Sequence, residues 1–515
     1  MPDSEDAAVT AGEAYRSRLR GLLDATSDVQ ALWSDGRWTT WGDVAHCAAS
    51  AAQQLVALGI GPGDPVLLVL RNRPSAVAAL LSCLMRRIPP VLMSYQQPQG
   101  QLVATAGALD VTAVILDRED YKGDLPQMLE RMALPVVLVS SGSEVAVVVP
   151  PVPDDGIRIT EGRSVDSSQV AMFVPTSGTT GTPKHVSLPW DRLPLGRESA
   201  TRPAAGPEER PPVIQAMTMA SITGVRSVLG AVGGGRSLLL LDRVDVDQWT
   251  KLVEHYGIRV GGLPPAAMRS MLDTKIPPDR LRSMRAWITG SAPLDPSLQA
   301  EFEEYFGVPV LVAYGSTETG GAVASWTLEL HRDWRDSKLG SVGRANPGVT
   351  LEIRDESTDR PVSSGEPGIL MARPAGSSTW VRTSDRALLD ADDFLFVLGR
   401  ADDVVIRGGF KVSLGDVEAL FRQHPAVRDV GAVGLDDERL GQVPAVGVVL
   451  RTGAAVTPDQ LREWAIERVV RYQVPKIAVL AELPMGATHK VNRSALRKIL
   501  ADAMQDQEKH VGSST

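Results

Sequence analysis

Hydrophobic and polar residues near the start of the chain alternate between helical and strand spacing. Residues 43–58 (DVAHCAASAAQQLVAL) repeat apolar positions at helical spacing, and the turn sequence GIGPGD ends this segment. The apolar run VLLVL at 66–70 follows it, as expected for a buried strand. A helix beginning at Pro74 and a strand at 114–117 then repeat the same order. Because helices that alternate with strands are typical of parallel sheets, the pattern predicts a βαβ architecture.

The pattern also predicts where this architecture ends. Strands at 237–242 and 284–290 continue the alternation, which we extend to about residue 400. From residue 401 the order changes to helix, strand, strand, helix, strand, helix, and Thr457 and Gln460 have the spacing of a capping box. We therefore predict an α/β protein with two parts, a large multi-subdomain N-terminal α/β domain over residues 1–400 and a small α+β C-terminal domain over residues 401–515.

Composition and charge narrow the class of protein. Hydrophobic residues make up 43% of the chain and charged residues 22%, which is typical of a globular protein. The formal net charge is −9 and there is no basic block, which argues against nucleic acid as a partner. Two cysteines, Cys47 and Cys83, are too few for a disulfide framework and favour a reducing cytoplasm. No apolar stretch reaches the length of a membrane span, so we also expect no membrane partner.

A loop of small hydroxylated residues and glycines carries the sharpest chemical signal. It spans Val174–Val186 (VPTSGTTGTPKHV) and differs from the Walker A spacing. A cluster of Ser, Thr and Gly alone is more often a plain flexible loop, but the whole thirteen-residue string favours a site for polyphosphate. Glycine amides approach anionic oxygens closely, hydroxyls add donors and a lysine adds positive charge. The residues expected to act in this way are Thr176, Ser177, Gly178, Thr179, Thr180, Gly181 and Lys184.

Six further motifs follow this loop in a fixed order along the chain. Together with the loop they resemble the adenylate-forming enzymes, a family that includes acyl-CoA synthetases, adenylation domains of peptide synthetases and luciferases. The resemblance covers almost the whole chain and is strongest to a stand-alone acyl-CoA ligase. The motifs are GSAPL (290–294), YGSTE (314–318), GSVGRANPG (340–348), RTSD (382–385), LGRADDVVIRGGFKVSLGDVE (398–418) and LPMGATHK (483–490).

The resemblance implies a nucleotide site around YGSTE. Tyr314 stacks on adenine, Gly315 and Thr317 belong to the same nucleotide-binding segment, and Glu318 helps to hold Mg²⁺ on the phosphates of ATP. Taken alone, a Tyr and a Glu four residues apart are more often ordinary surface residues, and only their place in the series of motifs overturns that interpretation.

The resemblance also assigns roles on the sugar and on the reacting phosphate. Asp385 accepts hydrogen bonds from the ribose hydroxyls, and Arg400 donates to the same sugar or to a phosphate. Lys490 bridges the substrate carboxylate and the α-phosphate, where negative charge develops as pyrophosphate leaves. With Glu318 and Lys184, Lys490 completes the predicted catalytic set.

The small domain is expected to turn between the two half-reactions. The resemblance places a hinge at Asp402. It places Gly408 and Gly409 in the loop that lines the tunnel for the pantetheine arm of coenzyme A, where glycine lets the backbone lie against a narrow thiol arm. On its own, RGGF is equally well a simple turn.

Evidence on the acid is weaker. Peptide-synthetase adenylation domains have an aspartate near the segment that corresponds to MTMASITG (217–224), and its absence here disfavours an α-amino acid. Small side chains suggest a roomy pocket, although packing between helices explains them equally well. The residues concerned are Ser221, Gly224, Gly290, Ser291, Gly320 and Gly321.

We therefore predict an ATP-dependent ligase that activates a small-molecule carboxylic acid as acyl-AMP and transfers the acyl group to coenzyme A, with Mg²⁺ as cofactor. Two alternatives stay open. In the first, the chain is an adenylating enzyme that passes acyl-AMP to a separate enzyme or carrier protein. In the second, it is a decayed, non-catalytic sensor of acyl groups or nucleotides.

Overall fold

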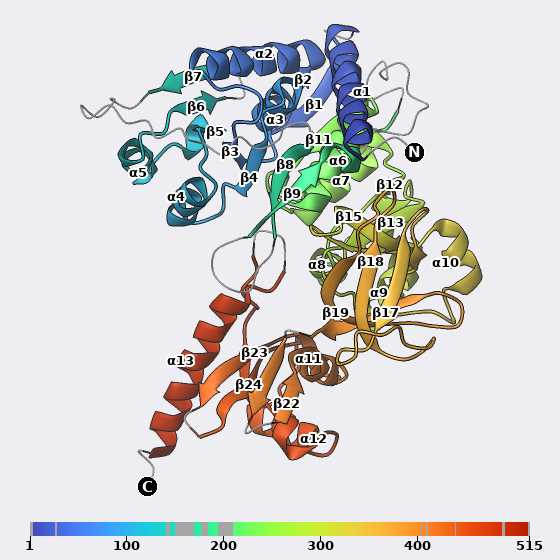
Figure 1. Cartoon of the computed structure of the whole chain (residues 1–515). Coiled ribbons are helices and arrows are strands. Elements are labelled where there is room, and N and C mark those ends of the chain that lie inside the picture. Colours follow the sequence, from blue (N-terminus) through green and yellow to red (C-terminus); the bar gives the residue numbers. More distant parts are fainter. Residues whose placement is uncertain are drawn as a thin grey trace. The chain divides into compact units, whose positions relative to one another are not determined.

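The chain packs into two units (Figure 1), and the five-stranded sheet β12-β13-β14-β15-β16 has residues in both of them. The first unit holds Met1–Leu311 with Gly315–Ala322, and the second holds Val312–Tyr314 with Val323–Thr515. The computed structural model describes residues 4–25, 28–140, 145–149, 169–176, 184–193, 210–401, 403–407, 410–437, 439–486 and 490–512.

A seven-stranded sheet in the order β7-β6-β5-β3-β4-β8-β9 dominates the first unit. Its central strands are parallel, and the edge strands β7 and β9 run antiparallel to their neighbours. Every residue of β3, β4 and β5 is buried, as predicted for strands covered on both faces. The strands are β3 (Val66–Leu70), β4 (Pro90–Ser94), β5 (Ala113–Asp117), β6 (Val136–Val139), β7 (Val145–Val148), β8 (Val170–Pro175) and β9 (His185–Pro189).

Helices cover both faces of this sheet (Figure 1). Leu68 and Ile115 belong to a core that also contains residues of α2 and α3, whereas Leu67 and Val114 face a second core with residues of α4 and α5. The period of two along each strand thus separates two apolar cores, and the predicted βαβ architecture is confirmed. The helices are α2 (Trp41–Ala57), α3 (Pro74–Arg86), α4 (Gln99–Ala108) and α5 (Leu125–Arg131).

The rest of the first unit adds a second sheet and a layer of helices. The second sheet has the order β10-β11-β1-β2. Trp249 of α7, Trp287 of β13 and Phe302 of α9 form a chain of ring contacts with centroids 4.9 and 4.7 Å apart. The elements are α1 (Ser4–Ala25), β1 (Gln30–Ser34), β2 (Arg37–Thr40), β10 (Val213–Gln215), α6 (Ile222–Gly233), β11 (Leu238–Leu240), α7 (Val246–Tyr256), β12 (Val260–Gly261), α8 (Pro265–Asp273), β13 (Ala286–Gly290) and α9 (Pro296–Phe306).

An antiparallel sheet forms the first part of the second unit. Its order is β17-β18-β19-β20, and each strand pairs antiparallel with the next. The alternation of helices and strands predicted up to about residue 400 therefore ends earlier. The elements are β14 (Val310–Ser316) and β15 (Gly321–Ser325), which have residues in both units, then α10 (Leu328–Trp334), β16 (Arg344–Ala345), β17 (Thr350–Arg354), β18 (Gly368–Arg373), β19 (Val381–Leu389) and β20 (Leu395–Arg400).

The last part of the second unit has the predicted order of elements. A hairpin, β21 (Val404–Arg407) and β22 (Phe410–Ser413), precedes them and was not predicted. The sheet order is β22-β21-β24-β23, with β25 parallel to β24. The predicted sequence of helix, strand, strand, helix, strand, helix follows as α11 (Leu414–Arg422), β23 (Val427–Asp437), β24 (Gly441–Leu450), α12 (Pro458–Ile466), β25 (Lys476–Leu480) and α13 (Arg493–Gly512).

The two faces of this sheet bury different helices. Val446 and Val448 of β24 pack with residues of α11 and α12, while Ala445 and Val449 pack with residues of α13. On the α13 side, a Cβ on Gly447 would lie 2.6 Å from Leu480 and 3.0 Å from Leu496. The absence of a side chain at this position therefore lets α13 lie close against the strand.

The predicted helix starts are present. The Thr457 hydroxyl accepts the backbone N–H of Gln460 at 3.2 Å, and the Gln460 side chain accepts the N–H of Thr457 at 2.9 Å, which completes the capping box. At the start of α11, Ser413 accepts the N–H of Asp416 at 3.2 Å.

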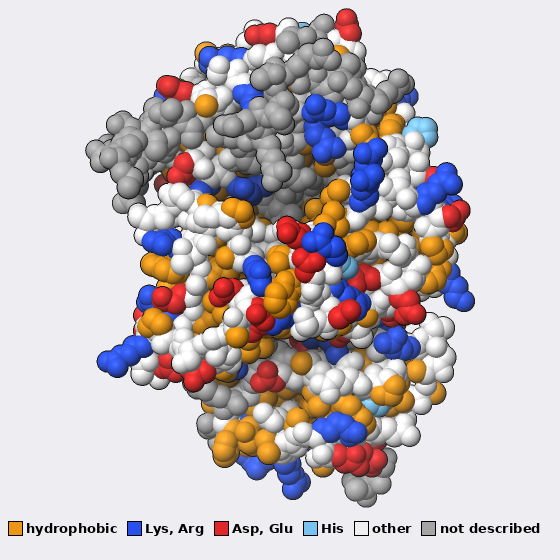
Figure 2. Space-filling model, turned by 90° about the vertical axis from the view of Figure 1, so that its right-hand side faces the viewer, with side chains coloured by type: hydrophobic (Ala, Val, Ile, Leu, Met, Phe, Trp, Pro, Cys, Tyr) orange, Lys and Arg blue, Asp and Glu red, His pale blue; other side chains and the backbone are white. Residues whose placement is uncertain are grey.

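The surface mixes charges of both signs. On the face drawn in Figure 2, Lys and Arg side chains are interspersed with Asp and Glu side chains. Both cysteines, Cys47 and Cys83, are free and buried. In the part of the chain that the structure describes, no helix combines the length and the apolar character needed to cross a membrane.

Gly447→Ala should loosen the packing of α13 on β24. The new methyl group would overlap Leu480 and Leu496, and overpacking of this kind costs about 1–3 kcal/mol. We expect faster hydrogen exchange in peptides from β24 and α13 of the full chain. Gly415→Ala is the matched control, because its Cβ would be 3.6 Å from the nearest atom, an ordinary contact. Equal exchange in both variants would contradict this packing argument.

Candidate active site

The predicted phosphate loop is closed at its base by a strand pair. β8 and β9 pair through Val174 with Val186 and Pro175 with His185. Beyond them, the backbone N–H and the hydroxyl of Thr176 donate to the carbonyl of Lys184 at 2.7 and 3.2 Å. The two ends of the loop are thus held together, and the Lys184 side chain is exposed. The remaining predicted loop residues lie outside the described residues: Ser177, Gly178, Thr179, Thr180 and Gly181.

The turn of YGSTE lies against this base. The Thr317 hydroxyl donates to the carbonyl of Pro175, the last residue of β8, at 3.4 Å. Two motifs that are 142 residues apart in the chain are therefore in contact. The neighbouring Glu318 side chain is exposed, and its carboxylate is accessible to a cation.

Thr319 shapes this turn and was not predicted as a site residue. It is only 4% exposed, and its hydroxyl accepts the N–H of Ser316 at 3.0 Å and donates to the carbonyl of Gly321 at 2.8 Å. The sequence offered one signal for this role, which was another hydroxyl side chain, Thr319, directly after Glu318 in a turn.

Gly315 has a steric reason to be glycine. A Cβ at this position would lie 2.1 Å from the carbonyl oxygen of Gly321, so β14 and β15 approach each other only without a side chain here. Gly320 and Gly321 have φ values of +71° and +130°, which favour glycine at the return of the turn. These glycines therefore determine the backbone path of the motif.

The predicted ribose and adenine residues meet within the second unit. The Tyr314 hydroxyl donates to the carboxylate of Asp385. Burial, and then the negative charge of Asp385, raise the pKa of Tyr314 well above its usual value, so the phenol stays protonated. Asp385 of β19 stands opposite Arg400 of β20 in the strand register. Tyr314, Asp385 and Arg400 thus form one cluster.

The small residues predicted for an acid pocket have structural roles of their own. Ser221 caps α6, since its hydroxyl accepts the N–H of Gly224 at 3.1 Å and donates to the carbonyl of Thr218 at 2.8 Å. A Cβ on Gly224 would lie 2.0 Å from that same carbonyl. Across from the helix, Gly290 ends β13, and the hydroxyl of Ser291 lies 3.4 Å from that of Thr223. The structure therefore brings the start of α6 and the end of β13 together.

A partly buried arginine stands beside these residues and was not predicted. Arg226 of α6 lies so close to Gly321 that a Cβ there would be 2.9 Å from its Nε. Partial burial lowers the pKa of Arg226, and the nearby Arg192 lowers it further. Its guanidinium donates to the backbone carbonyl of Arg192 and has no acidic partner among the described residues. A partly buried cation of this kind suits an anionic group of a ligand.

Asn72 holds the segment that leads into α6, and it too was not predicted. The side chain is 3% exposed, and its amide donates to the carbonyls of Met217 and Leu241 at 2.9 Å each. Its carbonyl oxygen accepts the N–H of Met219 at 3.0 Å. A polar residue two positions after the buried strand β3 was the only local signal, because its partners are more than 140 residues away.

The other predicted residues lie in the second unit. Lys490 is exposed, and its backbone carbonyl accepts the N–H of Gly486 at 2.7 Å just before α13. The hinge residue Asp402 and the tunnel residues Gly408 and Gly409 lie outside the described residues.

Comparison with known proteins identifies the family. The sequence profile described as AMP-binding enzyme matches residues 23–378, and the profile described as AMP-binding enzyme C-terminal domain matches residues 416–490. The chain belongs to the AMP-binding enzyme family. The predicted resemblance to adenylate-forming enzymes is thereby confirmed.

Relatives of this AMP-binding enzyme match along nearly the whole chain. The 2-succinylbenzoate–CoA ligase of Geobacillus kaustophilus is 28% identical over 492 residues, which are 92% of this chain and 95% of that protein. The 2-succinylbenzoate–CoA ligase of Bacillus cereus is 25% identical over 497 residues, 93% of this chain and 97% of that protein.

Solved structures share the fold. ATP-bound MatB from Rhodopseudomonas palustris has a TM-score of 0.76 at 21% identity and covers 94% of this chain and 98% of its own. The o-succinylbenzoate CoA synthetase MenE from Bacillus subtilis, in complex with its acyl-adenylate intermediate, has a TM-score of 0.72 at 23% identity and covers 93% and 97%. The predicted fold class, a large α/β part followed by a smaller α+β part, is confirmed.

The described residues of this AMP-binding enzyme fit a magnesium ion that is held mainly by a nucleotide. They contain no group of three or more His, Cys, Asp or Glu side chains arranged to hold a metal by themselves. Mg²⁺ in nucleotide sites needs only one or two carboxylates, because phosphate oxygens and water supply the other ligands. The exposed Glu318, beside the base of the loop, meets that requirement.

Asn72→Asp should destabilise the first unit and disturb the segment at 217–219. The substitution keeps the shape but replaces an amide donor by a carboxylate that faces two carbonyl oxygens, which costs about 2–4 kcal/mol. We expect a lower unfolding temperature by calorimetry and a higher KM for the acid than in the parent chain. Asn492→Asp is the control, because Asn492 accepts the N–H of Ala495 and a carboxylate can do the same. Equal effects of the two changes would contradict the role of Asn72.

Proposed function

We propose that this chain activates a small-molecule carboxylic acid with ATP and passes the acyl group to coenzyme A. The acid and ATP give acyl-AMP and pyrophosphate, and the thiol of coenzyme A then displaces AMP to give a thioester. The observation that carries the proposal is the contact of Thr317 with Pro175, which joins YGSTE to the base of the phosphate loop. The relatives named CoA ligases match this chain over almost their whole length, which supports this class of reaction.

In this proposal the phosphate loop and Glu318 hold the phosphate end of ATP. Thr176 and Lys184 close the base of the loop, and the exposed Lys184 ammonium is a donor for phosphate oxygens. Glu318 is the protein ligand of Mg²⁺, which neutralises charge on the phosphates when it is bound. One tight turn thus serves both the loop and the metal.

Tyr314, Asp385 and Arg400 hold the adenosine end. The Tyr314 hydroxyl fixes the phenol ring on Asp385, so the ring face is oriented in advance for a purine. Asp385 keeps further acceptor capacity on its carboxylate for the ribose hydroxyls. Arg400, opposite Asp385 in the strand pair, donates to the sugar or to the phosphate.

The first half-reaction then depends on position and charge. A substrate carboxylate is already ionised at neutral pH, so no general base is required. Its oxygen forms a bond to the α-phosphorus, and the bond from that phosphorus to the pyrophosphate oxygen breaks. The Lys490 ammonium stabilises the charge that develops on the α-phosphate oxygens.

The second half-reaction requires a different orientation of the small domain. We propose that residues 401–515 turn about Asp402 relative to residues 1–400, and that Gly408 and Gly409 then line the path of the pantetheine arm. The attacking sulfur forms the thioester bond, and AMP leaves with the electrons of the broken carbonyl–oxygen bond. A separate carrier protein with the same thiol arm is an alternative acceptor.

For the acid, we propose an aromatic carboxylic acid that binds where α6 and β13 meet. Ser221 and Gly224 at the start of α6 lie beside Gly290 and Ser291 at the end of β13, with Gly320 and Gly321 near Arg226, and the partly buried Arg226 favours an acid with a second anionic group. 2-Succinylbenzoate, which the names of the relatives contain, has this character. We also propose a cytoplasmic location, since Cys47 and Cys83 are free thiols and form no disulfide.

The direct test is pyrophosphate release from a panel of acids, with and without coenzyme A. The panel contains 2-succinylbenzoate, benzoate, a fatty acid and common amino acids. We expect aryl acids to exceed amino acids and coenzyme A to convert the adenylate into a thioester detectable by mass spectrometry. Adenylate that accumulates without thioester formation would support transfer to another protein instead. The absence of pyrophosphate release with every acid would support a non-catalytic sensor.

Lys490→Ala should separate the two half-reactions. Loss of one charge donor in the transition state lowers the rate of acyl-AMP formation roughly a hundredfold. Thioester formation from supplied acyl-AMP should stay close to that of the parent chain, because Lys490 serves only the adenylation arrangement. Lys498→Ala, which removes another exposed lysine of the same region, is the control. An equal loss in both half-reactions would contradict the assignment.

A further inference from the structure

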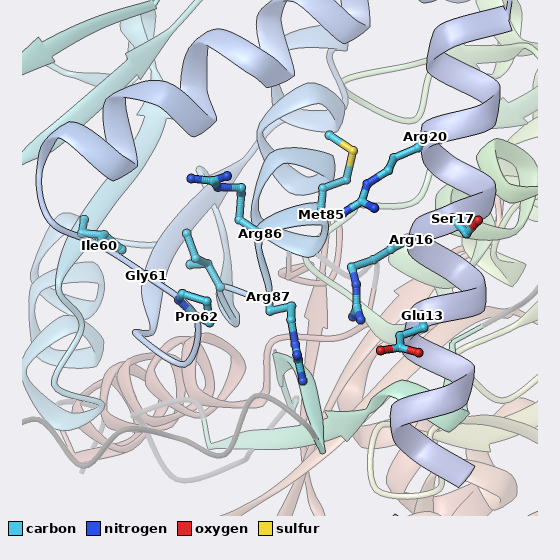
Figure 3. A pocket seen from close by; sticks show the side chains of 11 residues that line it. Glu13, Arg16, Ser17, Arg20, Ile60, Gly61, Pro62, Met85, Arg86 and Arg87 are labelled. Carbon is cyan, nitrogen blue, oxygen red and sulfur yellow. The ribbon is translucent and has the colours of Figure 1, made fainter. Parts of the chain in front are cut away.

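A cavity in the first unit, apart from the residues assigned to the proposed active site, is lined by an unusual number of arginines. It has a volume of about 590 Å³ and lies between α1, the end of α3 and the turn after α2 (Figure 3). Four arginines and a single glutamate line it, and none of the residues assigned above to ATP or the acid does so. The charged residues are Glu13, Arg16, Arg20, Arg86 and Arg87.

Arg16 is a buried cation that stacks on an aromatic ring. Arg16 is only 7% exposed, and its guanidinium carbon lies 5.0 Å from the centre of the Trp190 ring. Gly12 makes this stacking possible, because a Cβ there would be 3.1 Å from both the guanidinium and the ring. Burial, and then the charge of Arg87, lower the pKa of Arg16, while the charge of Glu13 raises it.

Arg87 faces the cavity from the other side. It ends α3 in the left-handed conformation, with a φ of +59°, where glycine would fit without strain. Its Nε atom is buried and has no hydrogen-bond partner. The chain thus has a strained arginine with an unsatisfied donor at a position where the backbone favours glycine.

Of the residues that the structure describes, Glu13 is the only acidic side chain that lines the cavity, and its charge acts on Arg16. None of the four arginines forms an ion pair with another described residue, although the chain has ion pairs at many other arginines. Figure 3 shows Arg16 and Arg87 extending from opposite elements toward the same space. Positive charges held together in this way, two of them partly or wholly buried, favour the binding of an anion with several charges.

The remaining lining residues set the kind of anion. Ile60, Pro62, Met85 and Ile88 give the cavity an apolar wall. Guanidinium groups match phosphate oxygens in paired hydrogen bonds, and a terminal phosphate carries about −1.5 to −2 charges at neutral pH. We propose that this cavity binds a small molecule with two linked phosphates and an apolar or ring-containing part, of the nucleoside diphosphate class, at a site separate from the adenylation site.

The proposal is tested by calorimetric titration of the full chain with ADP, with pyrophosphate and with citrate. Arg87→Gly removes the guanidinium and relieves the backbone strain, so the variant should fold at least as well as the parent. Lys275→Gly is the matched control, because Lys275 is an exposed cation with a φ of +52° in the same unit. Arg20→Gln, on the exposed face of α1, is a second test variant.

We expect the parent chain and Lys275→Gly to show one ADP site that Arg87→Gly lacks, or binds at least about tenfold more weakly. Arg20→Gln should also bind ADP more weakly than the parent chain. Tighter binding of ADP than of pyrophosphate would assign a role to the apolar wall, whereas equal binding would limit the site to the diphosphate group. Unchanged binding in Arg87→Gly, equal losses in Arg87→Gly and Lys275→Gly, or equal binding of citrate would overturn the proposal. Pyrophosphate release in the acid panel reports the proposed catalytic function independently of these titrations.

Discussion

The close approach of two strands at Gly315 determines the candidate site. The carbonyl of Gly321 occupies the space that a Cβ on residue 315 would need, so β14 can turn back into β15 only with glycine there. The turn between these strands then carries Thr317 to the end of β8 and leaves Glu318 exposed. The residue on the other side of Gly315 is Tyr314, which bonds to Asp385. A single steric constraint therefore fixes the backbone of the YGSTE motif, which contains both Tyr314 and Glu318.

Much of the fold could be predicted because burial is visible in the sequence. The strand β3 is apolar at every position and β5 is apolar up to its last residue, Asp117, and the helices α11 and α12 begin with capping residues. The sheet β17–β20 escaped prediction because only β18 is a buried apolar run, whereas most residues of β17, β19 and β20 are partly or fully exposed. Without a continuous apolar run or a strict alternation in these three strands, periodicity gives no signal for them.

In the candidate site, too, some residues could be predicted from the sequence and others could not. Residues within ordered motifs, such as Tyr314 and Asp385, were predicted as site residues because the resemblance placed them, and the structure brings these two together. Asn72 and Arg226 were missed because they act on backbone or on glycine far away in the sequence. A contact of this kind leaves no pattern of spacing, so only the folded chain shows it.

Acyl-AMP formation in Gly315→Ala tests the account most directly. The measurement is single-turnover pyrophosphate release with the best acid of the panel, on protein whose helix content is checked by circular dichroism, with Gly100→Ala as control because nothing lies within 4 Å of a Cβ there. The account predicts a loss of at least about a hundredfold with helix content retained, since the displaced turn misplaces donors and metal ligand together. Pyrophosphate release at the rate of the parent chain would contradict it.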